Sequence, residues 1–116
     1  ALTRYVLLPD GQKIILRDIL YTEYNNHVIT IHRKRSAPAQ TRLGQAAFEA
    51  LLVDDPFMIS CSKGLMVNLY EVERLETDAF ILSDGTALPV SRRKAKEVQA
   101  IYDEFLFRKM RKEMLT

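Results

Sequence analysis

The sequence is poor in the residues that build disulfide frameworks and metal centres. Cys61 is the one cysteine among 116 residues, so no internal disulfide can form, and a single thiol fits a protein of the reducing cytosol. The two histidines, His27 and His32, cannot complete a zinc site with one cysteine unless carboxylates join them, and nothing lies at metal-ligand spacing. We therefore expect neither a metal nor another cofactor.

Long apolar runs are also missing. No stretch approaches the ~20 apolar residues that cross a bilayer, and the start, "ALTRYVLLPDGQ", lacks the apolar region of a signal peptide. The composition, 47% hydrophobic and 28% charged, is ordinary for a soluble globular domain. We expect one domain that does not contact a membrane. Because the sequence does not begin with methionine, we expect it to be either a domain of a longer protein or a trimmed chain.

The residue patterns of enzymes and of RNA-binding sheets are missing as well. Cys61 with His27 or His32 is the one nucleophile and base combination available, and the sequence gives no reason for these side chains to meet. Aromatic residues interleaved with basic ones on an exposed sheet, the usual sign of RNA binding, do not occur. We expect a protein that is not an enzyme and does not bind RNA.

Charge is present, and it is segregated along the chain. The net charge is +2, yet residues 31–45 hold four basic and no acidic side chains, and residues 89–116 hold eight basic and four acidic ones. Residues 46–88 hold two basic and eight acidic side chains. This pattern allows a basic face despite the small total, and the alternative is a solvated surface without a partner.

Turn signals and alternating apolar residues predict an α+β fold dominated by successive antiparallel hairpins. Hairpin turns are expected at Pro9-Asp10-Gly11, Asn25-Asn26 and Asp84-Gly85. In "HVITIH" the alternation places Ile29 and Ile31 on one face of a strand. Two further strand-like runs are separated at Ser62-Lys63-Gly64.

Two helices complete the predicted fold. The segment "RLGQAAFEALLVDD" predicts a short helix capped by Thr41, and a longer helix is predicted from Ser91 as its cap to the end of the chain. The apolar stripe of the short helix is expected to consist of Leu43, Ala47, Ala50 and Leu51, widened by Phe48 and Leu52.

Arg92 and Arg93 lie in an unexpected place, where the last strand ends and the long helix begins. Cations near a helix N-terminus are unfavourable by roughly 0.3–1 kcal/mol each, because the helix dipole is positive there. The four basic residues near the end of this helix, from Arg108 to Lys112, do complement the dipole. Local folding therefore explains the later cluster and does not explain the arginine pair.

The segment "FMISCSKGLMVNLYEVERLETDAFILSDGTALPVSRRKAKEV" resembles the LytTR-type DNA-binding domain of bacterial response regulators. The shared features are a strand leading to Cys or His, a polar turn, "VN", a hairpin with "DG", and "SRR" opening a helix. Upstream, "DILYTEYNNHVITIH" resembles the first long hairpin of the family, and the resemblance covers residues 3–100. Residues 101–116 are then a helical extension of a single domain spanning residues 1–116.

The resemblance implies sequence-specific binding of double-stranded DNA by a bacterial transcriptional regulator whose loops read successive grooves. In the family, bases are read from the first hairpin turn, the turn after the Cys or His strand, and the "SR" of the last strand, which here gives His27, Lys63 and Arg92. The middle turn departs from the family, which commonly has His, then Arg or Asn, then Ser, where this chain has Ser62, Lys63 and Gly64. Candidates for phosphate contacts are Asn26, Arg33, Lys34, Arg35, Ser62, Ser91 and Arg93.

Other partners follow from the same reasoning. A homodimer on repeated half-sites and a receiver or other sensory domain outside this sequence are expected. The alternative function is a protein-interaction or dimerisation module acting through the amphipathic C-terminal helix, in which "EFLFRKM" is apolar on several sides.

Several conspicuous residues receive structural interpretations. Cys61 is expected to pack as a small apolar side chain, Asn68 to bond the backbone, and Asp84-Gly85 to form a turn. The aromatic residues expected in the core are Phe48, Phe57, Phe80, Tyr102 and Phe105.

Overall fold

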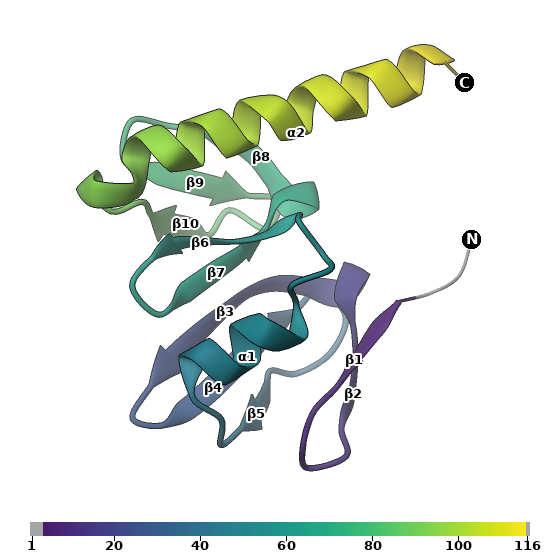
Figure 1. The fold of residues 1–116 in the computed structure, drawn as a ribbon, viewed down its shortest axis with the longest axis vertical. Coiled ribbons are helices and arrows are strands. Elements are labelled where there is room, and N and C mark those ends of the chain that lie inside the picture. The colour runs from purple at the N-terminus through teal and green to yellow at the C-terminus, as the bar shows by residue number, and fades with distance from the viewer. Residues whose placement is uncertain (1–3, 116) are drawn as a thin grey trace.

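The computed structural model describes residues 4–115 and is built from short antiparallel strands with two α-helices (Figure 1). The helices are α1 (Gln45–Leu51) and α2 (Ala95–Leu115). Three single 3-10 turns, at Leu16–Asp18, Leu69–Glu71 and Arg92–Lys94, link successive elements. The strands are β1 (Tyr5–Leu7), β2 (Lys13–Ile15), β3 (Ile19–Asn25), β4 (Val28–Arg33), β5 (Ala39–Thr41), β6 (Met58–Ser62), β7 (Leu65–Asn68), β8 (Val72–Leu75), β9 (Ala79–Leu82) and β10 (Ala87–Pro89).

The strands form three antiparallel sheets. The central sheet has the order β5-β4-β3-β7-β6, β1 and β2 form a separate hairpin, and the third sheet has the order β10-β9-β8. The long pairing of β3 with β4 and the pairing of β3 with β7 bring the hairpin of residues 19–33 beside the hairpin of residues 58–68. The predicted fold class is confirmed.

The central sheet separates two hydrophobic cores. On one face, Phe48 of α1 packs with Ile29 and Ile31 of β4, and all three are fully buried. On the other face, Phe80 of β9 and Val98 of α2 are buried together with residues of β6 and β7. In Figure 1, α1 lies by β3 and β4, whose residues join the first core, and α2 lies by β8 and β9, whose residues join the second. The expected burial of Ile29 and Ile31 on one strand face is confirmed.

The start of α1 differs from the prediction. Thr41 does not cap this helix, because it belongs to β5, where it pairs with Ile29 and is buried. Gly44 occupies the cap position, and no side chain caps the helix there. Edge pairing with β4 satisfies the backbone of residues 39–41, so the chain after the basic loop is extended rather than helical.

The apolar stripe predicted for α1 is confirmed only at Leu43, which precedes the helix and packs half-buried against the first core. Ala47, Ala50 and Leu51 are exposed, and the helix is anchored by Phe48 and Leu52, the residues expected only to widen the stripe. Since α1 ends at Leu51 it has about two turns, and one large aromatic side chain and its i+4 neighbour suffice to hold it.

The remaining boundaries follow the predicted turns closely. The segment after Phe57 was predicted as two strand-like runs, but it forms the three strands β6, β7 and β8. A 3-10 turn at Leu69–Glu71 separates β7 from β8. Among the expected core aromatics, Phe48, Phe80 and Tyr102 are buried. Phe57 and Phe105 are half-buried and flank the exposed ring of Tyr70.

Candidate nucleic-acid interface

The turn of the first long hairpin lies at Asn26 and His27. Both residues adopt positive φ, of 52° and 65°, between the paired residues Asn25 and Val28. The predicted turn was therefore one residue too early, and His27 lies inside it. Histidine and asparagine adopt this left-handed conformation more readily than most residues. His27 is exposed, and its Nδ1 lies 3.4 Å from the hydroxyl oxygen of Tyr24.

The second turn, between β6 and β7, is joined to the first. Gly64 adopts a φ of +74°, and its carbonyl oxygen accepts a 2.8 Å hydrogen bond from the backbone N–H of Tyr24. A Cβ at Gly64 would lie 3.3 Å from the Tyr24 carbonyl oxygen. Close approach of the two backbones thus places the exposed Lys63 near the His27 turn.

The junction between β10 and α2 is joined to the second turn. The backbone N–H of Ser91 donates a 3.0 Å hydrogen bond to the carbonyl oxygen of Cys61, at the end of β6. Ser91 stands at the cap position as predicted, but its side chain makes no capping hydrogen bond, and Arg92–Lys94 form a 3-10 turn before α2 begins at Ala95. In Figure 1 the two hairpin turns and the start of α2 lie along one side of the molecule, at the left.

A depression of about 520 Å³ lies between the second turn and the start of α2. Ser62, Lys63, Ser91 and Arg93 line it, so four of the predicted DNA contacts lie around one hollow, while Arg92 is exposed outside its lining. Further lining residues are Gln45, Glu49, Ser60, Gly64, Lys94 and Glu97.

Lys94 is a residue at this hollow that sequence reasoning did not single out. Its Nζ donates a 2.7 Å hydrogen bond to the hydroxyl oxygen of Ser60, and the lysine is half-buried. The available signal was its position two residues after Arg92, within the same basic run. Ser60 could not be identified from the sequence as the partner of Lys94, because only tertiary packing brings the two residues together.

The basic loop after β4 lies elsewhere. Arg33 ends the strand that begins beside His27, so the two residues are separated by roughly 20 Å of extended chain. Each basic side chain of this loop has an internal partner. Arg33 donates to the carbonyl oxygen of Ala37, Lys34 pairs with Glu71 at 3.1 Å, and Arg35 lies 3.4 Å from Asp18.

The cations of the turns contrast with those of the loop. Within residues 4–115, none of the ion pairs includes Lys63, Arg92 or Arg93. Exposed cations without carboxylate partners are available to an external anion, and Lys63, Arg93 and Lys94 outnumber the two carboxylates, Glu49 and Glu97, that line the same hollow. The arrangement suits a polyanion that spans several turns.

The sequence predicts structural roles, and no DNA contact, for Cys61, Asn68 and Asp84. Cys61 is buried, and burial raises the pKa of its thiol to about 11. Asn68 is buried, donates to the carbonyl oxygen of Ile19 at 2.9 Å, and accepts from the backbone N–H of Tyr70. The Asp84 side chain accepts from the N–H of Thr86 in the β9–β10 turn. All three interpretations are confirmed.

Among the residues that the structure describes, no group of three or more His, Cys, Asp or Glu side chains could hold a metal ion. Neither of the two α-helices, over their described residues, is long and apolar enough to cross a membrane.

Known proteins give a consistent comparison. The LytTr DNA-binding domain family matches residues 12–103. Among solved structures, the chain is similar to the LytTr DNA-binding domain of a methyl-accepting/DNA response regulator from Bacillus cereus, with a TM-score of 0.70 and 17% sequence identity. That match covers 85% of this chain and 94% of the other, and it shows a common fold. The search of curated proteins found no match. The family matches residues 12–103 of this chain, and the chain shares its fold with a solved LytTr domain. The chain therefore belongs to the LytTR family of DNA-binding domains, which act in response regulators.

Proposed function

We propose that this domain binds double-stranded DNA sequence-specifically, with its three adjoining turns laid against successive parts of one DNA face. The observation that carries the proposal is the convergence of the His27 turn, the Lys63 turn and the Arg92 junction at one edge. Backbone hydrogen bonds between neighbouring turns fix their spacing, so the edge is organised before DNA arrives.

Base reading is assigned to His27, Lys63 and Arg92. An arginine can donate two hydrogen bonds to O6 and N7 of guanine in the major groove, which is worth about 1–3 kcal/mol of discrimination. Lys63 offers a more mobile point charge, and the imidazole of His27 can donate to a base edge. Among residues 4–115, no ion pair includes Arg92 or Arg93, so DNA accounts for two cations beside the start of α2.

Phosphate contacts are assigned to residues that surround these three. Arg93 and Ser62 line the depression beside Lys63, and Asn26 adjoins His27 in the first turn. Ser91 stands at the cap position before Arg92–Lys94 and has no side-chain capping bond, so its hydroxyl is free to meet a phosphate.

Phosphate contacts from Arg33, Lys34 and Arg35 also remain a prediction, but these residues differ from the ones above in already having partners. Their side chains are engaged within the chain, and they lie at the far end of the β3–β4 hairpin. A phosphate would have to share or displace these internal partners. We therefore expect the loop to add general affinity and no base preference.

The test is selection of bound duplexes from a random DNA library at near-physiological salt, followed by the matched variants Arg92→Ala and Arg93→Ala. An enriched motif is expected, and Arg92→Ala should relax one position of that motif while lowering specific affinity about 5–150-fold. Arg93→Ala should weaken specific and non-specific binding alike and reduce the salt dependence.

Three results would count against the assignment. Binding without an enriched motif would leave only a basic surface. Equal effects of Arg92→Ala on specific and non-specific DNA would make Arg92 a phosphate contact. A motif change caused by Arg93→Ala would exchange the roles of the two arginines, since Arg93 lines the hollow beside Lys63 and Arg92 does not.

A further inference from the structure

The second half of α2 extends beyond the family domain. The family match ends at residue 103, whereas the helix continues to Leu115. Val98 and Tyr102 of the first half are buried against the third sheet, and Phe105 is half-buried. In Figure 1 the helix then runs past the strands into open space.

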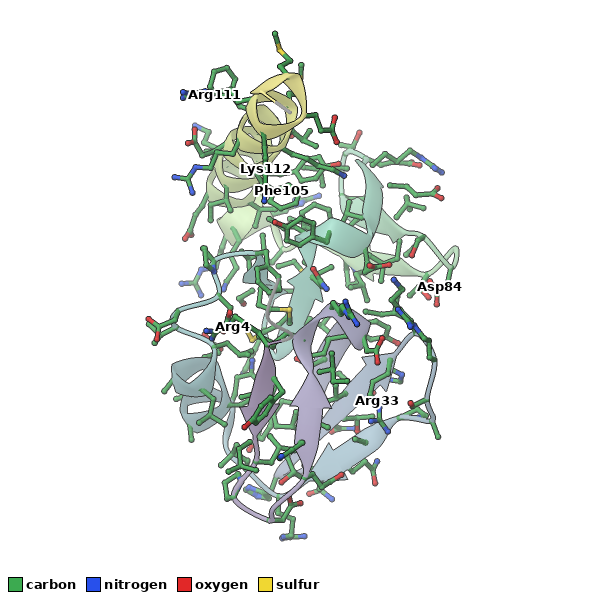
Figure 2. The ribbon with its side chains drawn as sticks, turned by 90° about the vertical axis from the view of Figure 1, so that its right-hand side faces the viewer. Arg4, Arg33, Asp84, Phe105, Arg111 and Lys112 are labelled. Carbon is green, nitrogen blue, oxygen red and sulfur yellow. The ribbon has the colours of Figure 1, made fainter. Side chains whose placement is uncertain are left out.

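This free half carries a stripe of exposed apolar side chains. The exposed fractions are 58% for Phe107, 60% for Met110 and 82% for Met114. Their spacing of three and four residues places them along one side of the helix, at alternating a and d positions of a heptad. Figure 2 shows Phe105 pointing towards the body of the domain and Arg111 pointing away from it, so the stripe lies on an outer side. A second helix with the same spacing would cover it.

Charge along α2 selects the direction of such a pairing. Residues 95–104 carry one basic and three acidic side chains, and residues 105–115 carry four basic and one acidic. When Phe107 lies against Met110 of an antiparallel second copy, the two helices overlap from about residue 102 onward, and Glu104 lies on the side of the partner's Arg111. The helix is thus complementary to itself in the antiparallel direction.

We propose that α2 mediates an isologous, antiparallel association of two copies of this chain through Phe107, Met110 and Met114. With Phe107 of one copy against the partner's Met110, the carboxylate of Glu104 lies on the side where the partner's Arg111 lies. Glu104 already accepts a 3.0 Å hydrogen bond from Arg108 of its own helix, so the carboxylate is shared between two guanidinium groups. Two such contacts occur in each symmetric pair.

The association leaves the DNA edge free. Phe107 lies fifteen positions after Arg92 along the 3-10 turn and α2, or roughly 22 Å of helix. The pairing therefore joins two domains at the ends remote from their turns (Figure 1). The inference does not depend on DNA binding, since the helix pair forms between free chains.

Sedimentation equilibrium of the chain without DNA tests the proposal. The weight-average mass is expected to rise above the 13.4 kDa monomer with concentration and to approach twice that value. Phe107→Ser with Met110→Ser should leave a folded monomer, because both side chains are exposed and outside the two cores. A strict monomer at high concentration in the unmodified chain would overturn the proposal.

Charge reversal tests the orientation. Arg111→Glu and Glu104→Arg should each raise the dimer dissociation constant about tenfold, and the double variant should restore association. Lys109→Glu makes the same change of charge outside the stripe and should have a smaller effect. If the double variant fails to restore association, or if Lys109→Glu raises the dissociation constant equally, the antiparallel pairing is overturned. Since no DNA is present, neither result bears on the DNA-binding proposal.

Discussion

The close approach of Gly64 to Tyr24 makes a measurable prediction about how the DNA edge is held together. Replacing Gly64 by alanine keeps the chain length and charge, but it forces a Cβ into the left-handed backbone at φ +74°. That conformation costs an L-residue roughly 1–2 kcal/mol. The new methyl group would also lie 3.3 Å from the carbonyl oxygen of Tyr24, which belongs to a paired strand and cannot easily withdraw.

Gly85 supplies a matched control. It has a φ of +90° in the β9–β10 turn, and a Cβ there would meet nothing within 4 Å. Gly85→Ala therefore carries the conformational cost alone, about 1–2 kcal/mol, whereas Gly64→Ala adds about 1 kcal/mol or more from crowding. The difference between the two variants measures the contact between the turns.

Urea denaturation provides the first readout and DNA affinity the second. An extra 1 kcal/mol lowers the urea midpoint of Gly64→Ala below that of Gly85→Ala by roughly 0.3–1 M. Because the Gly64 turn also positions Lys63, only Gly64→Ala should weaken DNA binding. Equal midpoints would refute the claim that this approach is tight, and unchanged DNA affinity would refute its role in spacing the turns.

Two further predictions concern buried polar chemistry. Since the Cys61 thiol has a pKa of about 11 in the fold and about 9 unfolded, it favours folding below pH 9, and this contribution is lost between pH 9 and 11. Denaturation should show the loss, about 2–3 kcal/mol, in the unmodified chain and not in Cys61→Ala; identical pH profiles would contradict it. Asn68→Leu should cost about 2–4 kcal/mol by denaturant unfolding, because it leaves the buried Ile19 carbonyl and the part-buried N–H of Tyr70 without their side-chain partner. An Asn68→Leu variant as stable as the parent would show that these bonds add nothing.

Local chemistry explains why most of the fold could be predicted from the sequence. Turns such as Asp84-Gly85 and strand faces such as that of Ile29 and Ile31 depend on residues only a few positions apart. They can therefore be recognised in the sequence alone. Failures occurred where tertiary contacts overrode local preference. Thr41 has the chemistry of a helix cap, yet the edge of β4 pairs with it instead.

The candidate site could be located from the sequence only in part. The turns at His27 and Lys63 and the junction at Arg92 carry local signals, and the family resemblance supplied their common purpose. The contact of Lys94 with Ser60 joins residues 34 positions apart and leaves no local trace. The internal partners of Lys34 and Arg35, Glu71 and Asp18, were invisible for the same reason.

These partners change how the basic residues are interpreted. By sequence, the loop at Arg33–Arg35 and the junction at Arg92–Lys94 are equally basic, with three consecutive cations each. In the fold, the loop cations neutralise carboxylates or bond a carbonyl, whereas those of the junction have no ion-pair partner among residues 4–115. A cation already paired must give up its partner before it can neutralise a phosphate, so its net gain on binding DNA is smaller. The salt dependence of DNA binding should therefore respond more to Arg93→Ala than to Lys34→Ala, and the reverse order would place the DNA along the far end of the β3–β4 hairpin.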